Sequence, residues 1–412
     1  MTLFLIIILS LFFLFIALKN FKLALGLIFL GLPLYLIKVD LFVIKNLLEI
    51  LILVCAIVFI VKLLKKEILL LKLSFLKDYW WLLVLLFVAL VVSILISEDK
   101  IRSLGVFKAW FLLPVLFGIM VGVVVKKKKD FLRLIYFFLS ASLILSILGL
   151  WQFLTGNTLE DGRVGAVFES ANYLAMFLGI GLCFIFLINE HKELYQRNLL
   201  RIVFVIIFFG FLLTRSQGAF LGFLLAILFG FLLKSKKVSV NFIILLVILA
   251  LFFQFFGPIL FFDEIKSAAR NSISTRLQIW YVSFQIFKDH PFLGIGLGQF
   301  EAVYQKYLPH FFFPPLEWLS PQPHSLYLAF LLQAGILGLI VFWLILRKVL
   351  KNILPSALND NALTFSILVA ILFIIFHGMV DTPYWKNDLA VIFWVLVFGT
   401  AAFLRIKAKK AA

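Results

Sequence analysis

Charged residues and cysteines are scarce in this chain. Only 14% of its 412 residues are Asp, Glu, Lys or Arg, whereas soluble globular domains carry about 25%. So few charges cannot cover a water-exposed surface, and this excludes an ordinary soluble enzyme. The two cysteines, Cys55 and Cys183, both lie within apolar runs. They offer neither a disulfide framework nor a thiolate metal site.

Apolar side chains, by contrast, are abundant. Hydrophobic residues make up 64% of the sequence, phenylalanine alone contributes 51 residues, and the mean hydropathy is +1.16. Disordered chains are polar and poor in aromatic residues, so the composition excludes a disordered chain as well. The sequence therefore predicts an all-α polytopic membrane protein.

Long apolar runs recur along the whole chain. A helix needs about 20 mostly apolar residues to cross the hydrocarbon core of a bilayer. Candidate spans lie near residues 2–18, 21–37, 46–63, 80–97, 106–125, 131–153, 170–188, 199–214, 217–233, 240–262, 324–346, 362–380 and 388–404. We expect about 12–13 transmembrane helices. The first run lacks the basic start and the small-residue cleavage site of a signal peptide, so we count it as a span.

Basic residues gather in short clusters between the apolar runs. The clusters lie at 126–129, 234–237, 347–351 and 405–410. Lys and Arg are enriched in cytoplasmic loops, and a single alternation of spans places all four clusters in the cytoplasm. The segments then predicted to be external are 155–169, 263–323 and 381–387. This topology explains most of the net charge of +18, so we expect no nucleic acid partner.

Segment 263–323 is much longer than the other predicted connections. Long loops are usually functional or disordered, and this one is too rich in aromatic residues to be disordered. Apolar residues recur every three or four positions from Ser274 to Asp289, which predicts an amphipathic helix ended by His290 and Pro291. We expect one or two such helices on the membrane face. The predicted division is a transmembrane bundle at 1–262, an external loop at 263–323, and C-terminal transmembrane helices with a cytoplasmic basic tail at 324–412.

Three alternating glycines, Gly294, Gly296 and Gly298, lie further along this loop. They resemble a dinucleotide-binding fingerprint, but that motif requires a preceding strand and a βαβ unit, which this sequence lacks. We therefore expect a tight turn.

Two arginines lie at unusual positions for a membrane protein. Arg215 lies with Ser216 and Gln217 in a tight junction predicted to face outward, where arginine is normally depleted. The alternative is an arginine that extends from a helix end to the interface. Arg276 lies in the first turn of the predicted loop helix, where the helix dipole disfavours a cation. A phosphate bound by both the helix end and the guanidinium would explain it, and a solvated arginine is the alternative.

Histidine and aspartate provide further candidates near the external boundary. His324 opens the span after the long loop and can accept a proton at neutral pH, although a lone histidine is more often structural. His377 and Asp381 are four residues apart at the outer end of the penultimate span. This spacing suits an ion pair or half a metal site, and because no further ligand is suitably spaced, we expect no metal.

Four segments together form a recognisable pattern. They are Arg163-Val164-Gly165 through Phe168 to Asn172 and Ala175, then Thr214-Arg215-Ser216-Gln217-Gly218-Ala219, then Arg276 through Trp280 to His290-Pro291 and Gly296, and last Pro323-His324-Ser325-Leu326-Tyr327-Leu328. Their residues and spacing resemble those of the O-antigen ligase and O-antigen polymerase superfamily of membrane glycosyltransferases. The resemblance covers roughly residues 100–400.

The resemblance implies a GT-C-like bundle that uses no cofactor and no metal. It implies a glycan donor on polyprenyl diphosphate and an acceptor hydroxyl on lipid A-core, on another glycan or on protein. Arg215 and Arg276 would hold the diphosphate, and His324 would act on the acceptor hydroxyl. The expected substrate-binding residues are Arg163, Asn172, Ser216, Gln217, Trp280, Tyr327, His377 and Asp381. The protein would lie in the inner (cytoplasmic) membrane, with its site on the external, periplasmic face and its C-terminus in the cytoplasm.

Several functions share this pattern. The single large late loop with Arg276, followed by the Pro-His element, favours a ligase, with a polymerase or a protein O-oligosaccharyltransferase as the alternative. A lipid or glycan transporter without chemistry is the alternative outside this class. A transporter predicts polar residues near the middle of the bilayer and often internal repeats, whereas the candidate residues here gather at one face.

Overall fold

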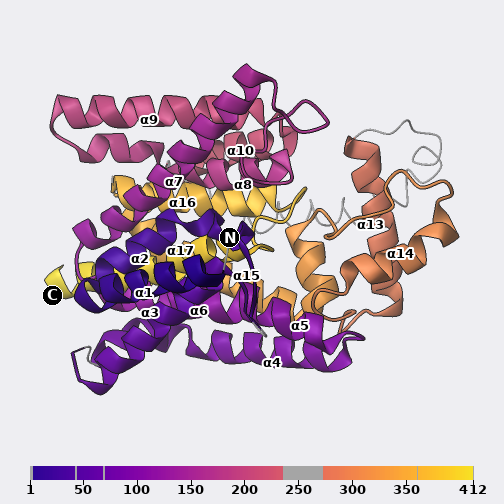
Figure 1. Ribbon diagram of the computed structural model, residues 1–412, viewed down its shortest axis with the longest axis horizontal. Helices are drawn as coiled ribbons and strands as arrows, with labels where there is room; N and C mark the ends of the chain where they lie inside the picture. The colour runs from indigo at the N-terminus through magenta and orange to yellow at the C-terminus, as the bar shows by residue number, and fades with distance from the viewer. Residues whose placement is uncertain (1–2, 42–43, 68–69, 235–271, 360, 412) are drawn as a thin grey trace.

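The computed structural model describes residues 3–41, 44–67, 70–234, 272–359 and 361–411. Helices dominate these residues, and the predicted all-α polytopic membrane fold is confirmed. Most helices lie side by side in one bundle (Figure 1). Two of them, α13 (Ser272–Asp289) and α14 (Phe300–Phe311), are grouped beyond one end of the bundle, and the C-terminus lies at the opposite end.

The remaining helices follow the apolar runs closely. They are α1 (Leu3–Lys19), α2 (Phe21–Leu30), α3 (Leu47–Leu64), α4 (Trp80–Ile96), α5 (Lys100–Phe107), α6 (Leu113–Val124), α7 (Lys128–Thr155), α8 (Ala171–Leu182), α9 (Leu194–Leu213), α10 (Gln217–Lys234), α15 (Leu326–Leu358), α16 (Ala362–His377) and α17 (Asn387–Ala411). A π-helical turn joins α5 to α6, and a 3-10 segment extends α8.

Among the described residues, eight of these continuous helices are long and apolar enough to cross a membrane, and four shorter apolar helices accompany them. Twelve of the thirteen candidate spans therefore coincide with helices. The remaining candidate, 240–262, lies outside the described residues. The domain boundary predicted after residue 262 also lies outside them.

The predicted span at 21–37 is wrong in its length. α2 ends at Leu30, and a 3-10 helix with Pro33 in its first turn follows over Leu32–Leu36, because proline has no N–H to continue an α-helix. The chain then pairs β1 (Lys38–Leu41) with β2 (Ile44–Asn46) in a small antiparallel hairpin. The pattern of apolar residues in the sequence did not predict this hairpin.

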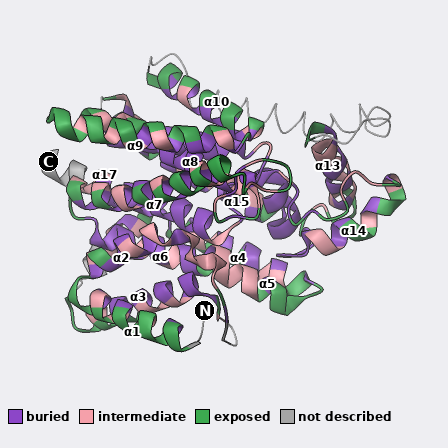
Figure 2. Ribbon diagram, turned by 45° about the horizontal axis from the view of Figure 1, so that its top comes forward, coloured by how far each residue is buried: buried purple, intermediate pink, exposed green. Residues whose placement is uncertain are grey.

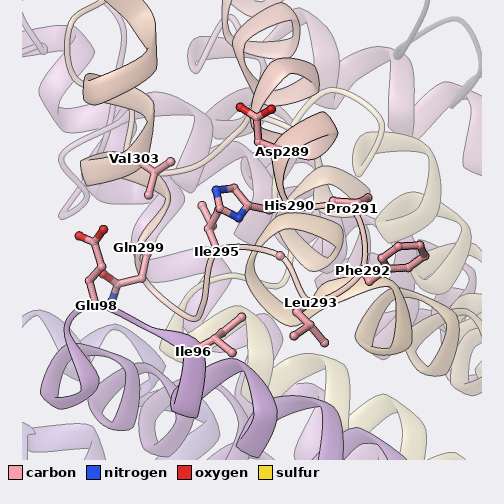
Figure 3. A pocket seen from close by; sticks show the side chains of 11 residues that line it. Ile96, Glu98, Asp289, His290, Pro291, Phe292, Leu293, Ile295, Gln299 and Val303 are labelled. Atoms are coloured by element: carbon pink, nitrogen blue, oxygen red, sulfur yellow. The ribbon is translucent and has the colours of Figure 1, made fainter.

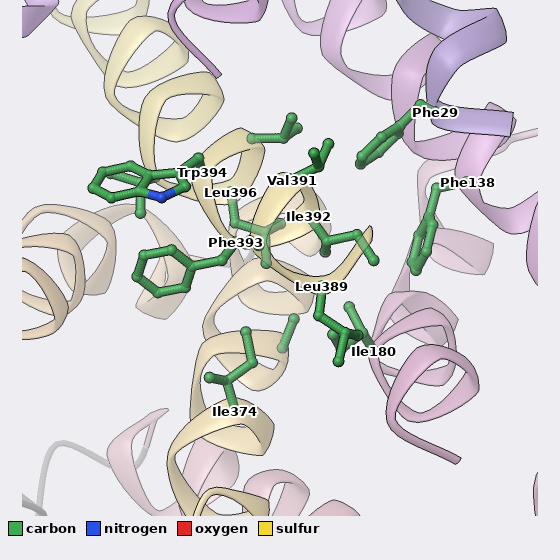
Figure 4. Packing of buried hydrophobic residues seen from close by; sticks show 14 of the residues in the cluster. Phe29, Phe138, Ile180, Ile374, Leu389, Val391, Ile392, Phe393, Trp394 and Leu396 are labelled. Carbon is green, nitrogen blue, oxygen red and sulfur yellow. The ribbon is translucent and has the colours of Figure 1, made fainter. Parts of the chain in front are cut away.

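The core of the bundle is built around α16 and α17. The side chains of residues 363–377 in α16 and 388–403 in α17 are almost completely buried. Figure 4 shows Phe393, Trp394 and neighbouring side chains of α17 filling the space between helices. Gly118 allows α6 to approach α17 closely, since a Cβ at this position would lie 2.7 Å from the carbonyl oxygen of Trp394. Small residues bring membrane helices together in this way.

The outer helices expose apolar side chains. α1, α9 and α10 carry exposed faces in Figure 2, and Phe12, Phe209 and Leu221 are each more than half exposed. Exposed apolar surface on this scale marks a membrane-facing protein.

A break in α15 anchors α13 and α14 to the bundle. Gly335 has φ +70° and ψ 178°, which interrupts the helix. The loop between α13 and α14 fits into the break: the Ile295 N–H donates to the Leu332 carbonyl, and the Ile336 N–H donates to the Phe292 carbonyl. A Cβ at Gly335 would lie 2.7 Å from the Phe292 carbonyl oxygen, so only glycine fits this break.

The loop helices match their prediction. α13 ends at Asp289, as predicted, and begins at Ser272, two residues before the predicted Ser274. Gly294, Gly296 and Gly298 all have positive φ, between +69° and +94°. The tight turn predicted there is confirmed, and it forms the loop that fits into α15.

Helix directions separate the basic clusters from the loop helices. The cluster at 126–129 spans the start of α7, Lys234 ends α10, and the clusters at 347–351 and 405–410 lie in the C-terminal parts of α15 and α17. The opposite ends of these four helices lie near 155, 217, 326 and 387. We call this opposite end of the bundle the site end.

Candidate active site

Three arginines from separate parts of the chain line one pocket at the site end, here called the arginine pocket. Its lining consists of Arg163, Asn172, Arg215, Ser216, Gln217, Gly218, Ser272, Ile273 and Arg276. The cavity has a volume of about 360 Å³. Six of the predicted site residues therefore meet in one place.

Arg215 occupies the turn that joins α9 to α10. Its φ of +50° lies in the left-handed region, and the turn is held by the Thr214 hydroxyl, which donates to the Phe211 carbonyl. The Thr214 hydroxyl oxygen also accepts from the Ser216 N–H. Arg215 is exposed, and among the described residues its guanidinium forms no hydrogen bond or ion pair. An arginine in this state is available to an anion.

Arg163 reaches the pocket from the loop before α8. Its Nε donates to Asp161 Oδ2 at 2.7 Å, and its Nη1 donates to Asn172 Oδ1 at 3.2 Å. The hydrogen bond from Arg163 holds the pKa of Asp161 below its ordinary value. These contacts fix one guanidinium beside the pocket and tie it to the first turn of α8.

Arg276 lies in the wall of the pocket, on α13. Its Nε donates to the Val380 carbonyl at 3.0 Å, and its Nη1 donates to the Ser272 hydroxyl. Its Nη2 lies 3.9 Å from Asp381 Oδ2. The guanidinium therefore lies between the pocket and a buried carboxylate.

Asp381 connects Arg276 to His324. Its side chain is 2% exposed, and its Oδ1 lies 3.5 Å from His324 Nδ1. The same oxygen accepts a hydrogen bond from the Thr382 N–H. Burial raises the pKa of Asp381, but the neighbouring side chains of His324, His377 and Arg276 outweigh burial and hold this pKa well below its ordinary value. Asp381 is therefore ionised.

His324 stands immediately before the N-cap of α15. Its φ is +44°, its carbonyl accepts a hydrogen bond from Trp280 Nε1 at 3.2 Å, and the Ser325 hydroxyl caps the helix by accepting from the Leu328 N–H. The ring is 33% exposed and directs Nδ1 toward Asp381. Its Nε2 forms no hydrogen bond within the described part of the chain. The ring is thus oriented on one side and open on the other.

Besides His324 and Asp381, three predicted site residues lie outside the lining of the arginine pocket. Trp280 supports the backbone of His324. Tyr327 is buried, donates to the Ile375 carbonyl at 2.6 Å and stacks on Trp343. His377 is 1% exposed, and its ring nitrogens have no hydrogen-bond partner among the described residues. Each of these side chains packs behind the site rather than at the pocket surface.

A second cavity, of about 400 Å³, lies between the end of α4 and the loop helices. Figure 3 shows Glu98 on one side of it and Asp289 and His290 on the other. Both acids already have partners: Tyr307 donates to Asp289 at 2.7 Å, and Lys306 lies 2.8 Å from Glu98. This cavity contains none of the predicted site residues.

Some residues of the site were not predicted from the sequence. The Val380 carbonyl that orients Arg276 has no side-chain signature. Asp161 carries a weak signal, because it lies two residues before Arg163. Asp381 was singled out for its spacing from His377, whereas its side chain lies beside His324 and Arg276.

The fold and the site together define a class: a polytopic membrane protein whose cationic and acid–base groups converge at one end of an apolar helical bundle. Residues 202–343 match the family model described as O-antigen ligase. This segment contains Arg215, Arg276 and His324, and it confirms the predicted resemblance to the O-antigen ligase superfamily. The match supports a membrane glycosyltransferase of the O-antigen ligase or polymerase type. No curated protein matches the chain.

Proposed function

We propose that this protein transfers a glycan from a polyprenyl diphosphate to an acceptor hydroxyl at the external face of the membrane. The observation that carries this proposal is the arginine pocket beside the His324–Asp381 pair. The family match over 202–343 supports the same class of reaction.

The arginine pocket suits a diphosphate. Arg163 is paired with Asp161, and Arg276 lies within ion-pair distance of Asp381. Arg215 has no such partner among the described residues, so the pocket keeps an uncompensated positive charge. Negative charge grows on the leaving diphosphate as the anomeric bond breaks. A preorganised donor at such a site is worth about 2.7–4 kcal/mol when it is removed.

The His324–Asp381 pair suits the acceptor. With Nδ1 facing an ionised carboxylate, the favoured tautomer carries its proton on Nδ1 and leaves the Nε2 lone pair open. Nε2 takes the proton of the acceptor hydroxyl, whose oxygen bonds to the anomeric carbon. The bond from that carbon to the diphosphate oxygen breaks, and the electron pair stays with the diphosphate. A positioned general base contributes about 10²–10⁴-fold.

The surroundings of Arg215 suit a lipid carrier. Leu212, Phe220 and Leu221 lie within a few residues of it and are exposed. A prenyl chain would follow these faces of α9 and α10 while its diphosphate enters the pocket. Because Lys and Arg are enriched on the cytoplasmic side, we assign the site end to the external face of the inner membrane and the C-terminus to the cytoplasm.

Within the superfamily, we favour a ligase over a polymerase or a protein O-oligosaccharyltransferase. The single late loop holding Arg276 and the Pro-His element after it motivate this choice, and lipid A-core is the corresponding acceptor. The proposed division stays at 1–262, 263–323 and 324–412. A transporter without chemistry is less well supported, because the polar groups gather at one end of the bundle rather than at its middle.

The test is glycan transfer in membranes that contain Arg215→Ala, Arg276→Ala or His324→Ala. Each variant should lose most transfer at normal protein level. Arg276→Lys should lose it too, since an ammonium cannot replace the planar fork that contacts Val380 and the diphosphate. Arg201→Ala is the matched control, because Arg201 is exposed and lies in the first half of α9, away from the pocket. Normal transfer by all three alanine variants would refute the proposed site.

A further inference from the structure

A second basic cavity lies at the site end, against the β1–β2 hairpin. We call it the hairpin pocket. Its lining consists of Tyr35, Leu36, Lys38, Val39, Lys45, Asn46, Glu169, Lys386 and Asn387. Its volume is about 540 Å³, larger than that of the arginine pocket. None of its residues was predicted to act in transfer.

Lys386 is the most constrained cation in this pocket. Its Nζ lies 3.1 Å from the centre of the Tyr173 ring and 5.6 Å from that of Tyr35, and it donates to the Tyr35 hydroxyl at 3.2 Å. Aromatic faces attract ammonium groups. The amine is therefore held at one position in the pocket wall instead of moving freely in solvent.

Lysines are the most frequent charged residues in the lining of the hairpin pocket. The lining contains Lys38, Lys45 and Lys386 with one acid, Glu169, while the charges of Asp388 and Asp381, outside the lining, also act on Lys386. Lys38 and Lys45 are exposed at the rim. The enrichment of lysine in cytoplasmic loops explains the clusters at the other end of the bundle, but it cannot explain three lysines at this end. An anionic ligand would explain them.

The hairpin pocket lies close to the reaction centre yet is separate from the arginine pocket. The chain at the start of α8 serves both: Asn172 lines the arginine pocket, Glu169 lines the hairpin pocket, and Tyr173 covers Lys386. The loop 378–386 likewise carries Asp381 near one end and Lys386 at the other.

We propose that the hairpin pocket binds an anionic group of the acceptor, a phosphate or a carboxylate, and thereby brings the acceptor hydroxyl to His324. This inference rests on the proposed function. The donor diphosphate needs the arginine pocket to itself, because a competing anion there would block the leaving group. A separate cationic subsite keeps the two negatively charged substrates apart, and the ring of the half-buried Tyr35 in the lining offers an apolar surface for a sugar ring.

The test measures binding of three probes to the full chain in phosphatidylcholine nanodiscs. The probes are dodecyl glucoside 6-phosphate, dodecyl glucuronide and uncharged dodecyl glucoside. We expect at least one anionic probe to bind about tenfold or more tightly than the neutral one, equivalent to about 1.4 kcal/mol. Preference for only one of the anionic probes identifies the group as a phosphate or a carboxylate. Lys386→Met keeps the stem but removes the charge, and it should abolish the preference.

Two further variants distinguish the loss of the anion site from misfolding of the protein. Lys386→Arg keeps the charge and should keep the preference. The double variant Lys38→Gln/Lys45→Gln changes only exposed side chains and should weaken anionic binding without affecting neutral binding. Lys288→Gln, an exposed lysine at the end of α13 and outside the pocket, is the control and should behave as the unmodified protein.

The proposed function is tested separately with farnesyl diphosphate, a donor analogue. Its binding should fall in Arg215→Gln and persist in Lys386→Met. Equal binding of all three glucoside probes, or an anionic preference that survives Lys386→Met and disappears in Arg215→Gln, would overturn the acceptor subsite. Farnesyl diphosphate binding that is unchanged when the arginine is replaced would instead overturn the proposal that the arginine pocket binds the donor.

Discussion

At the scale of single residues, Asp381 contacts both halves of the proposed chemistry. One carboxylate oxygen lies 3.9 Å from Arg276 and the other 3.5 Å from His324. A buried, ionised carboxylate between two cationic or protonatable groups fixes the orientation of both. Asp381 itself does not line the arginine pocket, so its role is to position the residues that meet the substrates.

Asp381→Asn tests this positioning role. The amide can donate to Nδ1 and favour the wrong tautomer of His324, so we expect the turnover rate to fall about 10²-fold or more. Farnesyl diphosphate binding should change much less, because Arg163 and Arg215 remain. The measurement is kcat for transfer beside the affinity for farnesyl diphosphate. Equal losses in both quantities would indicate a collapsed site and would argue against a positioning role.

The pKa of Lys386 predicts how the affinity of the hairpin pocket for an anion depends on pH. Burial lowers its pKa to about 8, against the charges of Asp388 at the start of α17, Glu169 before α8 and Asp381 in its own loop, which raise it. Raising the pH from 7 to 9 therefore neutralises the amine, and affinity for dodecyl glucoside 6-phosphate should fall several-fold. Lys386→Arg should remove this fall, because arginine stays charged. An unchanged affinity in the unmodified protein across this range would contradict the role of Lys386.

At the scale of elements, the glycine break in α15 matters most. It couples the loop helices, which hold Arg276, to the bundle, which holds His324. The loop 291–298 enters the break and forms backbone hydrogen bonds with both halves of the helix. The relative position of Arg276 and His324 therefore depends in part on this backbone conformation.

Gly335→Ala should weaken this coupling. An alanine at φ +70° costs about 1–3 kcal/mol, and its Cβ would also press on the Phe292 carbonyl. Gly105→Ala is the control, because nothing lies within 4 Å of a Cβ at that helical position, and alanine there should stabilise α5 by about 0.5–1 kcal/mol. The measurement is the thermal inactivation midpoint of the purified protein. We expect it to fall for Gly335→Ala and to hold or rise for Gly105→Ala; the reverse order would contradict the anchoring role of the break.

At the scale of the whole molecule, the sequence predicts the helices better than the site. Membrane spans can be predicted from apolar runs, because an apolar segment in a bilayer forms a helix in which every backbone group has an internal hydrogen bond. The hairpin at Lys38–Asn46 escaped prediction since its strands are only four and three residues long. Arginines and His324 were predictable because charge and imidazole are unusual at a membrane boundary. Their convergence was not predictable, since Asp381 lies far from Arg276 in the sequence.

The orientation of the whole bundle is testable with new cysteines. Both native cysteines are completely buried, so the background labelling should be low. Asn157→Cys, in the loop after α7, should react with a membrane-impermeant maleimide in intact cells, whose outer barrier is permeable to the reagent. Lys127→Cys should react only after the inner membrane is opened. The opposite pattern would place the site end in the cytoplasm.

The central claim is that one pocket holds the donor diphosphate while His324 acts on the acceptor. The most direct measurement compares farnesyl diphosphate binding with glycan transfer in His324→Ala and in Arg215→Ala, in the same membranes and at equal protein levels. We predict that His324→Ala keeps farnesyl diphosphate binding and loses transfer by about 10²-fold or more, whereas Arg215→Ala loses both. Full transfer by His324→Ala, or unaltered diphosphate binding by Arg215→Ala, would contradict the account.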